Sequence, residues 1–110
     1  MTDAVERIAG RLTRVEDLLA ALRRDHADLV SAAEGDNGDD EHDPEGATLA
    51  WEREHTAALI ARSEAEREAL RSALGRARDG SYGRCERCGS AIPTERLEVR
   101  PSATTCVACA

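Results

Sequence analysis

The sequence predicts a mainly α-helical protein: a long antiparallel helical hairpin (a coiled coil), followed by a small module built around four cysteines. Aromatic residues make up only 2% of the chain and phenylalanine is absent, and an apolar content of mostly leucine and alanine favours helix over sheet. Apolar residues recur at spacings of three and four along two long stretches, which an acidic segment separates. All four cysteines lie within the last 26 residues.

Residues 3–33 carry a regular apolar stripe that predicts one long helix. Its members step by three and four residues over about four heptads: Val5, Ile8, Leu12, Val15, Leu19, Leu22, His26 and Leu29. Because an apolar stripe of this length needs to be covered, we expect the helix to pack against a partner helix along its length.

An acidic segment, residues 34–46, interrupts the helical pattern. It contains three glycines, one proline and an Asn-Gly step, all of which favour turns. It also holds seven acidic residues and no basic one, so the net charge of −7 lies in this segment and the remaining charges balance. Nucleic-acid-binding proteins normally show a basic stripe and stacking aromatic residues. The composition therefore argues against direct, sequence-specific binding of DNA or RNA.

A second helix is expected over residues 47–78. Its stripe keeps the same spacing but includes polar residues: Leu49, Glu52, Thr56, Leu59, Ser63, Glu66, Leu70, Ala73 and Ala77. Two long helices joined by one loop are expected to fold back on each other as an antiparallel coiled coil. The predicted hairpin domain covers residues 1–80, with the acidic loop at its tip. Gly80 is expected to end the second helix in the left-handed conformation.

Residues 81–110 are predicted to form a separate metal-binding module. Cys85-x-x-Cys88 and Cys106-x-x-Cys109 are separated by 17 residues, a spacing that lets two thiolate pairs on tight turns close a tetrahedron. Gly89 follows the second cysteine and permits the sharp backbone of such a turn. Four thiolates favour zinc and leave no open position for catalysis, so we predict one structural Zn²⁺. The alternatives are free or redox-active cysteines and an iron–sulfur cluster.

Two other classes of protein are disfavoured by the sequence. It contains no apolar run of membrane-spanning length and no basic leader followed by an apolar core, so we expect a cytoplasmic protein without a membrane partner. Serine, histidine and aspartate residues show no spacing typical of a catalytic triad, and no glycine-rich phosphate loop follows a strand. We therefore expect a protein that is not an enzyme.

The stretch DGSYGRCERCGSAIPTERLEVRPSATTCVAC resembles the DksA/TraR zinc-finger proteins, bacterial regulators that bind RNA polymerase directly instead of DNA. The resemblance is carried by Gly80, Tyr82-Gly83, Cys88-Gly89, Ile92, Arg96-Leu97, Pro101 and the second cysteine pair. It implies that the coiled coil enters the secondary channel of bacterial RNA polymerase, where acidic tip residues approach the active-site magnesium and change initiation. Some members act with the alarmone ppGpp, and its involvement here stays open. Longer members continue into a C-terminal helix, so the resemblance is to a short form.

The acidic tip matches the family motif only at its opening. Longer members carry Asp-x-x-Asp-x-Ala, commonly beginning Asp-Pro, and Asp43-Pro44 matches that beginning. The second aspartate then falls on Gly46, whereas reading from Asp40 places Asp40 and Asp43 at the right spacing but loses the alanine. The resemblance therefore implies four tip residues that act on the polymerase, in this order: Asp43, Asp40, Asp39 and Glu45.

Five further residues are candidate contacts for a partner. Four arginines make the finger locally basic: Arg84, Arg87, Arg96 and Arg100. They either meet an acidic polymerase surface or compensate the net −2 charge of a zinc ion with four thiolates. Trp51, near the start of the second helix, is either an anchor of the hairpin or an exposed contact. The alternative function is a zinc-stabilised helical adaptor or stress protein with a different partner.

Overall fold

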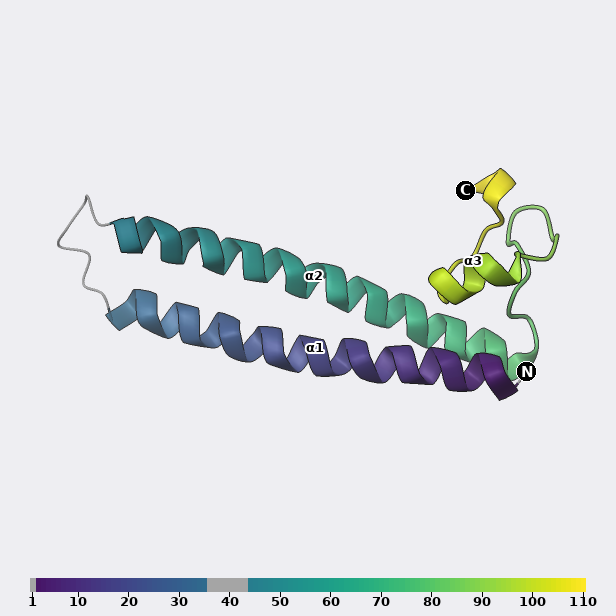
Figure 1. The fold of residues 1–110 in the computed structure, drawn as a ribbon, viewed down its shortest axis with the longest axis horizontal. Coiled ribbons are helices and arrows are strands. Elements are labelled where there is room, and N and C mark those ends of the chain that lie inside the picture. The colour runs from purple at the N-terminus through teal and green to yellow at the C-terminus, as the bar shows by residue number, and fades with distance from the viewer. Residues whose placement is uncertain (1, 36–43) are drawn as a thin grey trace. The chain divides into compact units, whose positions relative to one another are not determined.

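The mainly helical fold predicted from the sequence is confirmed. The computed structural model describes residues 2–35 and 44–110, with side chains described for 3–32 and 46–110. In this part of the chain the helices are α1 (Thr2–Gly35), α2 (Pro44–Asp79), α3 (Thr94–Val99) and a short 3-10 helix, η1 (Val107–Cys109), and no strand forms (Figure 1). None of these helices combines the length and apolar character needed to cross a membrane.

The second long helix begins earlier than the sequence pattern predicts. It starts at Pro44, whereas the expected start was residue 47, so residues 44–46 are helical and do not belong to the loop. The physical reason is that proline suits the first helical position, where its fixed φ is already helical and its missing N–H has no partner to lose. The predicted tip residues Asp39, Asp40 and Asp43 lie outside the described residues. Glu45 lies in the first turn of α2, where only the backbone is described.

The C-terminal end of α2 has the predicted left-handed glycine. Gly80 has a φ of 88°, and the Ser81 N–H donates to the Arg76 carbonyl at 3.0 Å, which satisfies a carbonyl left open by the end of the helix. The Asp79 carboxylate accepts from the Ser81 hydroxyl at 2.6 Å and from its N–H at 2.9 Å. These two hydrogen bonds lower the pKa of Asp79. The helix therefore stops sharply before the cysteine module.

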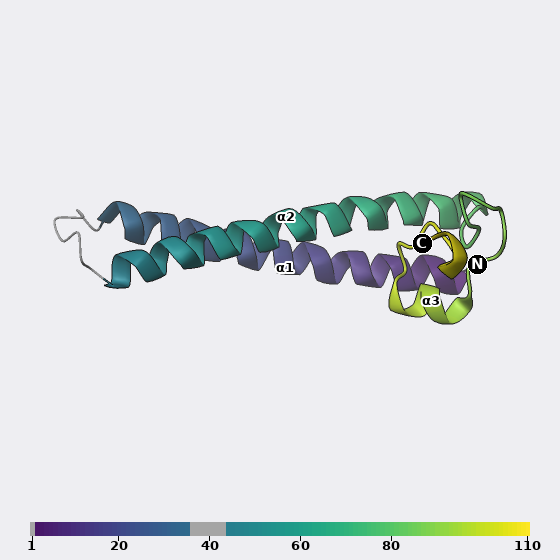
Figure 2. The same ribbon diagram turned by 90° about the horizontal axis from the view of Figure 1, so that it is seen from above.

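One compact unit consists of Glu16–Ala65, the second half of α1 and the first half of α2. The two helix segments run antiparallel, side by side in Figure 1 and crossing each other in the view of Figure 2. Leu19 is buried, with 1% of its surface exposed, and Ser63 on α2 is buried as well. An exposed ion pair joins the helices, with Arg23 Nη2 at 3.0 Å from Glu64 Oε2. Glu52, a member of the predicted stripe, is exposed instead of buried.

The other compact unit combines the ends of both long helices with the cysteine module, Met1–Val15 and Glu66–Ala110. Arg11 Nη2 lies 2.9 Å from Glu66 Oε1 and links α1 to α2. Alanine at two of the buried α2 positions leaves room for a close helix–helix approach. The buried residues of the helix pair come from both predicted stripes: Ile8, Val15, Leu70, Ala73 and Ala77. The domain boundary at residue 80 stays a prediction.

Candidate metal centre

The first cysteine pair lies on a tight turn after α2. The turn is closed by two backbone hydrogen bonds, from Cys85 N–H to the Ser90 carbonyl at 2.8 Å and from Gly89 N–H to the Cys85 carbonyl at 2.9 Å. Gly89 has a φ of 75°, a left-handed conformation that residues with a Cβ adopt at a cost. The sharp backbone predicted directly after Cys88 is therefore present.

The second cysteine pair is held by contacts with residues far along the chain. The Glu86 N–H donates to the Thr104 carbonyl at 2.9 Å, which ties the first turn to the segment before Cys106. The Arg96 side chain on α3 donates from Nε to the Thr105 carbonyl at 3.0 Å. These bonds fix the backbone on the N-terminal side of Cys106 and bring it next to the first turn.

A small apolar core supports the two turns. Ile92, Leu97 and Ala103 are buried together with Cys85 and Cys106, and Tyr82 packs against this cluster. The Tyr82 hydroxyl donates to the Pro101 carbonyl at 2.7 Å, across 19 residues of sequence. Burial raises the pKa of Tyr82, so the hydroxyl keeps its proton and remains a hydrogen-bond donor.

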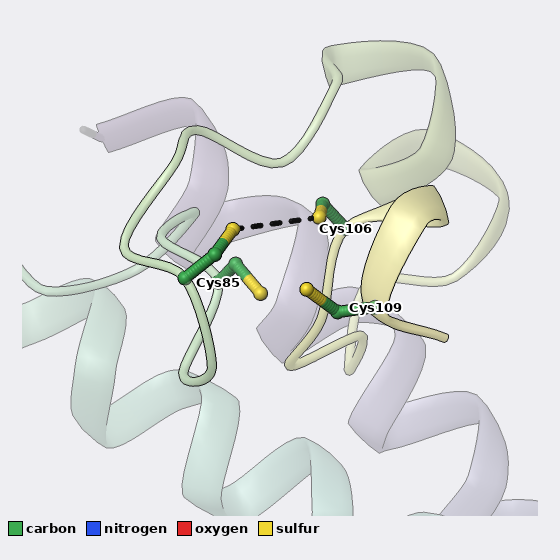
Figure 3. Close-up of side chains that lie close together, drawn as sticks. Cys85, Cys106 and Cys109 are labelled. Atoms are coloured by element: carbon green, nitrogen blue, oxygen red, sulfur yellow. Dashed lines mark hydrogen bonds between the residues drawn. The ribbon is translucent and has the colours of Figure 1, made fainter.

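The four cysteine sulfurs converge on one point. Their Sγ atoms all lie within 4.8 Å of one another, and those of Cys88 and Cys106 are 3.7 Å apart. Figure 3 shows Cys85, on the loop after α2, directed toward Cys106 and Cys109 from the C-terminal segment. A zinc–sulfur bond of about 2.3 Å gives a tetrahedron with edges of about 3.8 Å. The arrangement therefore fits a zinc ion bound by four thiolates.

The electrostatics of the cysteines show why a cation suits this site. Hydrogen bonds from the backbone of Cys106, Cys88 and Arg87 lower the pKa of the Cys85 thiol to about 6. In contrast, the neighbouring cysteines Cys106, Cys85 and Cys88 raise the pKa of Cys109 to about 12. Four thiolates this close repel one another, and a dication between them removes that repulsion. The donor set consists of sulfur only, which zinc accepts and harder ions do not.

The predicted partner contacts have different surroundings. Arg84 donates to the Gly89 carbonyl at 3.2 Å and Arg96 to Thr105, so both arginines brace the cysteine turns. Arg87 and Arg100 are exposed. Trp51 is 63% exposed. Its ring stacks on that of His55, with the centroids 4.9 Å apart.

Sequence reasoning did not identify the bracing roles of Tyr82 and Arg96. Both residues belong to the pattern GSYGRC…TERLEVRP, but their acceptors are backbone carbonyls 19 and 9 residues away. Neither a heptad nor a cysteine spacing encodes such a contact. The available signal was a tyrosine next to a cysteine turn in a chain with one tyrosine, because a buried tyrosine hydroxyl usually has a hydrogen-bond partner.

The chain is similar in sequence and in structure to known proteins. Residues 80–110 match the prokaryotic DksA/TraR C4-type zinc finger. The protein YteA of Bacillus subtilis (strain 168) is 40% identical over 99 residues, and the match covers 82% of this chain but only 40% of YteA. The chain therefore spans less than half the length of that relative. The transcription factor DksA2 from Pseudomonas aeruginosa has a similar structure, with a TM-score of 0.55 and 25% sequence identity over 88% of this chain and 80% of DksA2.

Proposed function

The chain belongs to the DksA/TraR family of zinc-finger proteins, and from this we propose that it is a transcription regulator that binds bacterial RNA polymerase directly. The observation that carries the proposal is the combination of a C4 finger at residues 80–110 with a helical hairpin similar in structure to the transcription factor DksA2. A regulator of this kind acts by binding to the polymerase, so we assign no catalytic group.

The chain carries one structural zinc, and we assign its ligands to Cys85, Cys88, Cys106 and Cys109. Bound zinc supplies a crosslink between two turns and offers no reactive position. The two turns are also held by hydrogen bonds that do not involve the metal. These come from the backbone near Cys106, the Arg96 side chain and the Tyr82 hydroxyl. Arg87 and Arg100 of the finger are exposed and therefore accessible to a partner surface.

The mechanism that we propose is insertion of the hairpin into the secondary channel of the polymerase. The hairpin would dock by shape, and its tip would act by charge through Asp43 and Asp40, supported by Asp39 and Glu45. Carboxylates delivered into a channel with little water interact with a nearby Mg²⁺ much more strongly than they do in bulk solvent. The segment that carries them has seven negative charges and no positive one, which supports an electrostatic role for the tip.

The double variant Asp40→Asn/Asp43→Asn separates docking from activity. We expect it to bind purified RNA polymerase like the wild type but to lose most of the effect on initiation in a purified transcription assay, run with and without ppGpp. The matched control is Asp17→Asn/Glu54→Gln, which removes the same charge from one exposed position on each long helix.

Two results would overturn parts of the proposal. If the tip variant regulates like the wild type, the tip carboxylates do not act on the polymerase. If the wild-type, zinc-loaded protein does not bind polymerase at all, the chain is a zinc-stabilised adaptor or stress protein for another partner. If ppGpp changes the effect of the wild-type protein on initiation, that nucleotide takes part in the mechanism.

A further inference from the structure

One part of the two long helices contains no buried residue. This part, called the distal segment below, consists of residues 20–32 of α1 and 46–62 of α2 and lies within the compact unit Glu16–Ala65. The leucines of its two stripes are only partly buried: Leu22, Leu29, Leu49 and Leu59. The apolar surface that holds the two helices together is therefore small in the distal segment.

The other ends of the same helices are packed more tightly. In residues 3–15 and 66–79, apolar side chains from both stripes are fully buried, with Ile8 and Ala73 at 0% exposure and Leu70 at 1%. Burial of apolar side chains is the main contribution that holds two helices together. Regions with few buried apolar contacts open more often than the rest of a protein, so the two ends of the helices are expected to differ in local stability.

An open hollow of about 410 Å³ lies between the two helices in the distal segment. Glu52 borders it, at a position of the α2 stripe that an apolar residue would otherwise fill. The Thr56 hydroxyl donates to the Glu52 carbonyl at 2.8 Å, so its proton is used within α2 and not between the helices. Both helices contribute to the lining of the hollow: Asp25, Asp28, Leu29, Glu52, His55 and Thr56.

The carboxylates around the hollow weaken the distal segment further. Asp25 and Asp28 border it from α1 and Glu52 from α2, and none of the three takes part in an ion pair in the described part of the chain. In contrast, Glu64 of α2 pairs with Arg23 of α1 at 3.0 Å. Like charges that face one another repel, and this repulsion falls when the helices move apart.

We propose that the distal segment is a separate opening unit, in which the two helices part and unfold while residues 3–15, 66–79 and the finger stay folded. Short helices without a packed partner are marginal in water, so their backbone hydrogen bonds are lost once the helices part. A partner that contacts both helices in the closed arrangement shifts the equilibrium toward that arrangement. Closing of the unit is therefore linked to binding, whichever partner the hairpin has.

Native-state hydrogen exchange, followed by NMR at low urea concentrations, tests the proposal on the zinc-loaded full chain. Protected amides of the distal segment are expected to exchange at least about tenfold faster than those of residues 8–15 and 66–77, after correction for intrinsic rates. They should also share one dependence on urea, because they are exposed in one cooperative step. Equal protection in all segments, or a steady gradient of rates without a shared urea dependence, contradicts the inference.

Ile8→Val tests whether the distal segment opens independently of the rest. Ile8 is fully buried, so the loss of one methylene group should speed exchange in residues 8–15 and 66–77 about fivefold. Exchange in the distal segment should not change, since its opening leaves the contacts of Ile8 intact. If both regions exchange faster by the same factor, the two helices unfold as one unit and the inference is wrong.

Glu52→Leu tests whether the hollow is the cause of the opening. The substitution supplies the missing apolar side chain and removes one of the facing charges, so exchange in the distal segment should become about tenfold slower. The matched control is Glu54→Leu, the same change at an exposed position of α2 that does not line the hollow, and it should exchange like the wild type. Equal effects of the two substitutions would show that the hollow does not control the opening.

Discussion

Replacing Leu19 with alanine is expected to lower the free energy of unfolding far more than the same change at the neighbouring Leu18. Leu19 is 1% exposed and Leu18 is 50% exposed, so the two leucines differ in burial but share helix, chemistry and propensity change. The substitution removes three carbon atoms at about 0.8 kcal/mol each when buried, or about 2.4 kcal/mol. The cavity left behind adds to this and brings the expected cost at Leu19 to about 3 kcal/mol.

The cost at Leu18 follows from its exposure. Half of its side chain is already in water, so the cost of removing the three carbon atoms falls to about 1 kcal/mol. Urea unfolding of the zinc-loaded protein, followed by far-ultraviolet circular dichroism, measures both variants. With a slope of about 1.5 kcal/mol per molar urea, the unfolding midpoint should fall by about 2 M for Leu19→Ala and by less than about 1 M for Leu18→Ala.

The comparison refutes the reasoning if the two midpoints fall equally. That result would mean that Leu19 is not in the seam between α1 and α2. A change in the slope, rather than in the midpoint, would instead indicate that the two compact units unfold separately.

Three further predictions concern the finger and the glycines. Gly89→Ala should lower the free energy of unfolding by about 1–2 kcal/mol because of the left-handed φ at this position, whereas Gly75→Ala, within α2, should raise it by about 0.5–1 kcal/mol. At neither glycine would the added Cβ meet an atom within 4 Å. Effects of the same sign in both variants would therefore contradict the backbone argument. Tyr82→Phe removes the hydrogen bond to the Pro101 carbonyl and should lower the free energy of unfolding by about 1–2 kcal/mol. The variant should also lose zinc to a chelator faster than the wild type. An unchanged rate of zinc loss would mean that this hydrogen bond does not support the finger. Cys106→Ser should reduce the zinc content below the value of about one per chain expected for the wild type, as measured by elemental analysis. Hydrogen exchange in residues 81–110 should become faster, while most of the helical circular dichroism signal remains. Stoichiometric iron in the wild type would overturn the zinc assignment.

The sequence by itself determined the helices and the metal centre, because both depend on local spacing. An apolar repeat of three and four residues produces one helix face, and the ends of α1 and α2 differ from the predicted ends by three residues or fewer. A Cys-x-x-Cys pair places two sulfurs on one turn whatever lies around it, so the four ligands could be predicted together. Gly80 and Gly89 were predictable for the same reason, since each is required by a backbone conformation at its own position.

Only the tertiary structure decided which side chains of the stripes are buried and which groups meet across the chain. Glu52 has the spacing of a seam residue, yet it borders an open hollow with Asp28, because the distance between the helices at that level depends on packing along their whole length. The Tyr82 hydroxyl meets Pro101 only after α3 has turned the chain back. Contacts of this kind depend on the register and approach of separate segments, which a one-dimensional pattern of residue types does not encode.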